Sequence, residues 1–182
     1  MLVGVLALQG DFAAHEAVLA RLGARTRRVR TPRDLEGIDG LVIPGGESTT
    51  MTLGVEREGL AGPIRALAAA GTPILGTCAG LIMLDRDHLA IMDIRATRNA
   101  FGRQVHSFVG PVEVAGVEGG PLSAAFIRAP WIAEHGPGVE ILGAVDGHPV
   151  AAREGNVTAV SFHPEITGDD RLHAAWLAGL AR

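Results

Sequence analysis

The one cysteine of the sequence lies in a pentapeptide whose composition suits a nucleophile. Gly76-Thr77-Cys78-Ala79-Gly80 follows an apolar run and precedes the helical run Leu81–Leu84. This matches the G-x-S-x-G nucleophile elbow with cysteine in place of serine. A tight strand-to-helix turn needs small neighbours, and it places the sulfur at a helix N-terminus, whose partial positive charge favours the thiolate. The pattern predicts a nucleophile at Cys78, and an inert buried cysteine is the alternative.

A thiolate that expels an amine needs an acid–base partner, and one lies late in the chain. Ser161-Phe162-His163-Pro164-Glu165 comes at the end of a predicted strand. Residues two apart in an extended segment point the same way, so Glu165 can orient the imidazole of His163. The spacing makes a Cys78, His163 and Glu165 triad possible, and a strand-end histidine without a catalytic role is the alternative.

A metal site is not expected. The zinc-deaminase pattern H-x-E requires a later P-C-x-x-C, and no cysteine follows Cys78. The other histidines show no H-E-x-x-H or similar spacing. We therefore expect neither a metal nor another cofactor.

The loop Pro44-Gly45-Gly46-Glu47-Ser48 follows another predicted strand. In an α/β sheet the crevice lies beyond the carboxyl ends of the strands, so this loop and the elbow should face one site. The backbone N–H groups of Gly46 and Ala79 could then form an oxyanion hole. Ser48 as the N-cap of the following helix is an alternative reading. A Walker-type phosphate loop is excluded because its lysine is missing.

The elements that position these residues alternate between strands and helices. We expect strands at 2–8, 26–30, 40–43 and 73–76, a helix after Asp11 that stops at Gly23, a helical turn at 31–34, and a helical stretch that ends at Ala70 before Gly71. Such alternation predicts a parallel sheet with helices on both faces. Short β-like runs follow, at 107–109, 112–114, 126–128, 139–142, 149–152 and 158–162, and a closing helix at 170–180. We expect these runs to extend the sheet and to add antiparallel strands, within a single domain over 1–182.

Composition excludes several classes of protein. The 182 residues are 47% hydrophobic and 20% charged, enough to bury one sizeable core. A net charge of −4 gives no basic footprint for nucleic acid, and no apolar run reaches the roughly 20 residues of a membrane span. All 16 basic residues are arginines, which excludes Schiff-base lysines. The N-terminus shows no secretory pattern and one cysteine forbids an intramolecular disulfide, so we expect a cytoplasmic protein.

Essentially the whole chain resembles the class I, triad-type glutamine amidotransferases, and among them the glutaminase subunit of pyridoxal 5'-phosphate synthase. The cysteine elbow and His163-Pro164-Glu165 are shared by that superfamily. The subgroup is indicated by the segments LQGD at 8–11, GGESTT at 45–50, RNAFGRQ at 98–104 and FIRAP at 126–130. The resemblance implies a three-layer, flavodoxin-like α/β fold with a mixed, mainly parallel sheet.

The resemblance also implies an activity. Cys78 would attack L-glutamine, and a thioester would yield glutamate and ammonia, which a separate synthase subunit in a large hetero-oligomer would use to build pyridoxal 5'-phosphate (vitamin B6). The glutamine site would be lined by Gly46, Glu47, Ser48, Arg98, Ile127 and Arg128. The alternatives are a glutaminase that serves another ammonia-using synthase, and a noncatalytic or redox-sensing member of the fold. The arginines have a plainer reading as surface charges or structural clamps.

Two features depart from the pattern of this family. The segment Asp85–Leu89 looks short, and His106 stands where an acidic residue is common. We expect the shorter segment to alter the rim of the site and to leave the triad untouched.

Overall fold

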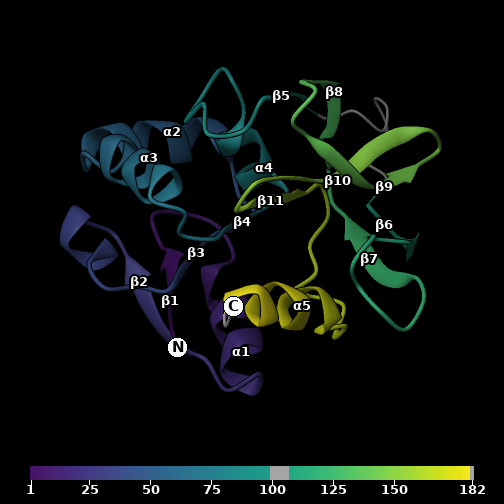
Figure 1. Cartoon of the computed structure of the whole chain (residues 1–182), viewed down its shortest axis with the longest axis horizontal. Coiled ribbons are helices and arrows are strands. Elements are labelled where there is room, and N and C mark those ends of the chain that lie inside the picture. Colours follow the sequence, from purple (N-terminus) through teal and green to yellow (C-terminus); the bar gives the residue numbers. More distant parts are fainter. Residues whose placement is uncertain (99–106, 181–182) are drawn as a thin grey trace.

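A seven-stranded sheet forms the centre of the computed structural model, which describes residues 1–98 and 107–180 (Figure 1). Its strands, in spatial order, are β2 (Arg25–Val29), β1 (Leu2–Leu6), β3 (Gly40–Ile43), β4 (Ile74–Thr77), β11 (Val157–Val160), β10 (His148–Glu154) and β9 (Glu140–Val145). All pairs from β2 to β11 are parallel, and β10 and β9 are antiparallel additions. The parallel part has the flavodoxin-like order, so the predicted fold class is confirmed.

Helices cover both faces of this sheet (Figure 1). On one face lie α1 (Phe12–Arg21) and α5 (Arg171–Leu180), and on the other lie α2 (Ser48–Arg57), α3 (Ala61–Ala69) and α4 (Ala79–Leu84). The side chains of β3 alternate accordingly: Val42 packs with Leu19 and Trp176, whereas its neighbours pack with residues of α2 and α3. Successive side chains of a strand point to opposite faces, and both faces are covered here, which explains the continuous apolar runs.

Two small sheets flank the β9 and β10 end of the molecule (Figure 1). β5 (Ile94–Thr97) pairs with β8 (Trp131–His135), and β6 (Phe108–Val112) pairs with β7 (Leu122–Phe126), both antiparallel. Phe126 at the end of β7 packs its ring against Phe108 and Phe162, with centroids 4.7 and 5.6 Å apart. This cluster joins the end of β7 to the segment that carries His163.

The short strands predicted after residue 106 extend the central sheet only in part. β9, β10 and β11 belong to it, whereas β6 and β7 form a separate sheet.

Local signals in the sequence account for most of the boundaries. Gly23 and Gly71 follow α1 and α3 with φ of +82° and +86°, as a C-terminal stop requires. The 3-10 helix η1 (Pro32–Leu35) has Thr31 as its N-cap, and the Thr31 amide donates to the Asp34 carboxylate over 2.8 Å. The expected single helical stretch is instead two helices, α2 and α3, because the chain turns at Gly59 with φ +67°.

Part of one predicted motif, and one predicted departure from the family pattern, lie outside the described residues. Residues 99–104 of the RNAFGRQ segment and His106 lie outside the described residues. β5 and β8 were not expected from the sequence.

Within the described parts of the chain, none of the helices has the combined length and hydropathy needed to cross a bilayer.

Candidate active site

Cys78 lies between β4 and α4, in the sharp turn that the sequence predicts. Its backbone has φ 49° and ψ −107°, which is a strained conformation for a residue other than glycine. The Cys78 amide donates to the Val160 carbonyl over 2.8 Å and so anchors the turn to β11. A Cβ on Gly76 would lie 2.8 Å from the Gly80 carbonyl oxygen, and a Cβ on Gly80 would overlap the Ile43 carbonyl. Both flanking glycines are therefore required by close backbone packing.

His163 approaches the same point from the segment after β11. Its amide donates to the Ala125 carbonyl over 2.8 Å in an isolated antiparallel bridge, which fixes it beside the end of β7. The imidazole Nδ1 lies 2.7 Å from Oε1 of Glu165, whose side chain is fully buried. A Cβ on Gly45 would overlap His163 Cε1 and lie 3.3 Å from Cys78 Cβ. The loop after β3 therefore packs directly against both His163 and Cys78.

The charge state of His163 follows from its two partners. Burial alone lowers the pKa of its imidazole, but hydrogen bonding and electrostatic attraction to Cys78 and Glu165 outweigh burial and raise the pKa to about 10. His163 is thus protonated at neutral pH, with Nδ1–H donating to Glu165. A protonated imidazole beside the sulfur is suited to giving a proton to a leaving amine.

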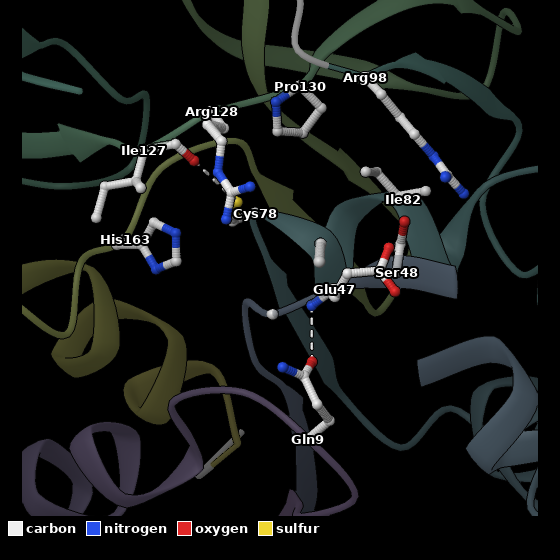
Figure 2. Close-up of a pocket in the computed structure, with 12 residues that line it drawn as sticks. Gln9, Glu47, Ser48, Cys78, Ile82, Arg98, Ile127, Arg128, Pro130 and His163 are labelled. Carbon is white, nitrogen blue, oxygen red and sulfur yellow. Dashed lines mark hydrogen bonds between the residues drawn. The ribbon is translucent and has the colours of Figure 1, made fainter. Parts of the chain in front are cut away.

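A pocket of about 350 Å³ opens over this pair (Figure 2). Every predicted site residue other than Glu165 lines it: Gly46, Glu47, Ser48, Cys78, Ala79, Arg98, Ile127, Arg128 and His163. Glu165 lies behind His163, as an orienting residue would. The structure therefore brings together all the residues that the sequence singled out, from five separate segments of the chain.

The floor of the pocket at α2 is held by Gln9, which the sequence analysis did not single out. Gln9 lines the pocket, and its Oε1 accepts the Glu47 amide over 2.7 Å (Figure 2). The Glu47 carboxylate accepts the amides of Thr49 and Thr50, and these hydrogen bonds, with that of the Thr50 hydroxyl, lower its pKa to about 2. Glu47 is therefore the N-cap of α2, and the reading of Ser48 as N-cap is wrong. The position of Gln9 after the first strand was the available signal.

Gly46 and Ala79, whose amides are predicted to form the oxyanion hole, both line the pocket. Ala79 is the first residue of α4, so its N–H has no acceptor within that helix. The Gly45 carbonyl accepts the Asp11 amide over 3.3 Å, and in a trans peptide the Gly46 N–H points the opposite way. The Gly46 amide thus points away from Asp11. That these amides bind an oxyanion stays a prediction.

Two arginines, Arg98 and Arg128, also line the pocket. Arg98 Nη1 lies 3.2 Å from the Thr49 hydroxyl, and Nη2 lies 3.5 Å from Nε2 of His88. His88 is held in turn by Asp85, with 2.7 Å between its Nδ1 and the carboxylate. The segment predicted to alter the rim therefore does contact a lining residue. Arg128 has φ +47°, and the carbonyl of Ile127 before it lies 3.8 Å from Cys78 Sγ.

Behind Glu165 lies a buried polar chain that sequence reasoning also missed. His15 Nε2 lies 3.4 Å from Glu165 Oε2 and 3.1 Å from the Thr77 hydroxyl. His15 Nδ1 lies 2.9 Å from His173 Nε2, and both histidines are fully buried. Within residues 1–98 and 107–180, no three His, Cys, Asp or Glu side chains are grouped so as to hold a metal ion.

Known proteins are similar to this chain in sequence over nearly its whole length. Residues 5–179 match the model of the SNO glutamine amidotransferase family. The pyridoxal 5'-phosphate synthase subunit PdxT of Salinispora arenicola is 52% identical, over 99% of this chain and 96% of the relative. That of Thermobifida fusca is also 52% identical, over 94% and 92%.

Two solved structures extend the likeness to three dimensions. A crystal structure of a glutamine amidotransferase has 42% identity and a TM-score of 0.92, over 99% of both chains. PurLQS from Thermotoga maritima, at 17% identity and a TM-score of 0.76 over 98% of both chains, shares the fold alone. The family match and these relatives confirm the resemblance drawn from the motifs, and this chain belongs to the SNO glutamine amidotransferase family.

Proposed function

We propose that this chain hydrolyses L-glutamine to L-glutamate and ammonia at Cys78. The observation that carries the proposal is the 2.7 Å contact of His163 Nδ1 with the buried Glu165, on an imidazole that also interacts with Cys78 in its strained turn. A nucleophile, an acid–base group and an orienting carboxylate in this arrangement are the parts of a catalytic triad.

The proposed reaction runs in two halves. The Cys78 sulfur attacks the side-chain amide carbon of glutamine, and the amide oxygen takes up negative charge facing the N–H groups of Ala79 and Gly46. His163 gives its proton to the departing nitrogen, which leaves as ammonia, and a glutamyl thioester remains on Cys78. Water then attacks the thioester while His163 takes its proton, and the C–S bond breaks to release glutamate.

The pocket offers matching groups for the rest of the substrate. Arg98 and Arg128 line the pocket, with Arg98 beside the start of α2 (Figure 2), and guanidinium pairs well with a carboxylate such as that of an amino acid. Gly46, Glu47, Ser48 and Ile127 complete the glutamine site. We therefore propose that the arginines bind the substrate instead of acting only as surface charges.

We propose further that the ammonia goes to a pyridoxal 5'-phosphate synthase. Proteins about half identical to this chain over nearly its whole length are named as subunits of that enzyme. The chain has no lysine, so amine chemistry on sugars or pyridoxal falls to a separate synthase subunit. We place the reaction in the cytoplasm, and we assign residues 1–182 to one glutaminase domain.

Glutamate release from glutamine tests this function. The chain is assayed with and without the synthase subunit, beside the Cys78→Ala variant in the same complex. We expect release that depends on Cys78 and ammonia that is consumed by the synthase. Wild-type release by Cys78→Ala would reject the proposed nucleophile, and release without ammonia consumption would reject the proposed partner.

A further inference from the structure

The Glu165 carboxylate has two oxygens, and only one of them contacts His163. Oε1 lies 2.7 Å from His163 Nδ1, whereas Oε2 is buried and has no hydrogen-bond partner of good geometry among the described residues. A buried, uncompensated carboxylate oxygen is costly. Nε2 of His15 lies 3.4 Å from Oε2.

The tautomer of His15 follows from its surroundings. A bare nitrogen facing a carboxylate oxygen would place two lone pairs against each other, so Nε2 carries the proton. Nδ1 then accepts from His173 Nε2–H over 2.9 Å. His173 Nδ1 is left as a buried acceptor without a partner among the described residues. The hydrogen bonds thus run in one direction, from His173 to His15 and from His15 Nε2 to the Thr77 hydroxyl, with Glu165 Oε2 beside that N–H at 3.4 Å.

Both of these histidines are neutral in this arrangement. Burial, followed by the electrostatic effects of His173 and His163, lowers the pKa of His15 well below its usual value. Burial lowers the pKa of His173 to about 4, against an opposing effect of Asp170. The groups that face the pair are Glu165, His163, Thr77, Asp170 and Arg21. With the positive charge on His163, neutral His15 is a hydrogen-bond donor that does not compete for the carboxylate as a second ion.

We propose that His15 is a positioning residue for the triad: its Nε2–H holds Oε2 of Glu165, which keeps Oε1 on His163 and the imidazole directed at Cys78. The hydroxyl of Thr77, next to Cys78 on β4, lies 3.1 Å from the same Nε2 and orients the ring, so the His15 N–H is shared between Thr77 and Glu165 Oε2. His15 comes from α1 and its support from α5, so the helices on one face of the sheet orient the site above it. This inference rests on the proposed glutaminase function.

Two substitutions of similar length separate donation from packing. His15→Gln keeps an N–H near the position of Nε2, and His15→Met has no hydrogen-bond donor. In the complex with the synthase subunit, we expect His15→Met to lower kcat about tenfold with KM nearly unchanged, which is about 1.4 kcal/mol of transition-state stabilisation. We expect His15→Gln to keep most of the wild-type kcat. Equal losses in the two variants would overturn the proposal.

A double-mutant cycle with Glu165 sharpens the test. In a Glu165→Gln background His15→Met should cost little further activity, because its effect passes through that carboxylate. A tenfold loss in both backgrounds would instead show that His15 acts by packing alone. If glutamate release proves independent of Cys78, the proposed function fails; if it depends on Cys78 and the cycle shows no coupling, this inference alone fails.

A measurement on the unmodified chain keeps the proposal testable should His15→Met not fold. Nitrogen chemical shifts of ¹⁵N-labelled histidine distinguish the two neutral tautomers. We expect His15 with protonated Nε2 and bare Nδ1 at neutral pH. A His15 protonated on Nδ1 cannot donate to Glu165 and would overturn the proposal.

Discussion

The two sides of Glu165 hold histidines of opposite character. On the pocket side, His163 has a pKa raised to about 10 and carries a proton at neutral pH. On the core side, His15 and His173 have pKa values lowered by burial and stay neutral. All three lie in a connected polar chain, so contact with other polar groups does not by itself decide the charge of a histidine.

The difference lies in what faces each ring. His163 interacts with both Cys78 and Glu165, which outweighs the cost of its burial. His15 is more deeply buried, which is the main reason its pKa is lowered, and the nearby His173 and the positively charged His163 lower it further. One buried carboxylate therefore supports one imidazolium, and it is the one beside the nucleophile.

The largest effects are expected at the nucleophile and its acid. Cys78→Ala and His163→Asn should each lower glutamate release at least about 1000-fold, because the two groups act as a unit. Combining the substitutions should add little to either one. Steady-state release by each variant in the complex measures this, and strictly additive losses would contradict a concerted pair.

Glu165→Gln should have a smaller effect, about 10- to 100-fold in kcat, because a neutral amide can still hold the ring while one anion is lost. The same change should lower the pKa of His163 from about 10, since one of its two stabilising partners loses its charge. Titration of the His163 ring by NMR checks the direction. An unchanged pKa would mean that Glu165 does not set the charge of His163.

Gly45→Ala should crowd the pocket side without touching the core side. The added Cβ would overlap the imidazole of His163, so we expect about a tenfold loss of kcat from a misplaced ring. Gly62→Ala in α3 is the matched control, because a Cβ there meets nothing within 4 Å. It should keep full activity, because it lies in α3 away from the pocket. Equal activities of the two variants would contradict the close packing of His163 on this loop.

The two buried histidines on the core side of Glu165, His15 and His173, should make the free energy of unfolding depend on pH. Above pH 6.5 His15 and His173 are neutral in both the folded and the unfolded chain, and below it the unfolded chain takes up protons that the folded chain does not. The free energy of unfolding should therefore fall as pH falls from 6.5 to 5, by up to about 1.4 kcal/mol per pH unit for each histidine. His163, with its pKa raised to about 10, is protonated in both the folded and the unfolded chain below pH 6.5, so it does not change the free energy of unfolding between pH 6.5 and 5.

His173→Gln isolates one of these two contributions. The glutamine amide can still donate to His15 but does not titrate in this range. The free energy of unfolding should therefore change with pH between 6.5 and 5 by one proton less, which is about 1.4 kcal/mol per pH unit. Urea unfolding at a series of pH values measures it. A slope equal to that of the wild type would show that His173 is not held neutral in the folded chain.

Local signals in the sequence were sufficient where one segment contains the whole feature. The strand Gly40–Ile43 and the cysteine elbow were predicted with their correct neighbours, because apolar runs and glycine spacing determine them locally. The break between α2 and α3 was missed, since a single Gly59 in a helical pattern does not indicate a stop by itself. β5 and β8 were missed because each is short and gains its stability by pairing with the other.

The site likewise divides into residues that a local motif reveals and residues that only contacts between distant segments bring together. Most residues that line the pocket were found through their motifs, but Gln9, Ile82 and Pro130 were not, nor were His15 and His173 behind the triad. His15 and His173 are 158 positions apart, and they meet because α1 and α5 pack on the same face of the sheet. No spacing within either helix carries that information. Contacts between distant elements therefore have to be read from the three-dimensional structure.

Covalent labelling of the nucleophile tests the central claim most directly. The complex is treated with a diazoketone analogue of glutamine, which alkylates a nucleophile that attacks the substrate amide position, and the peptides are identified by mass spectrometry. We expect one adduct per chain, on Cys78, in step with loss of glutaminase activity and suppressed by excess glutamine. An adduct on another residue that accompanies the loss of activity, or full inactivation with Cys78 unmodified, would contradict the assignment of Cys78 as the nucleophile.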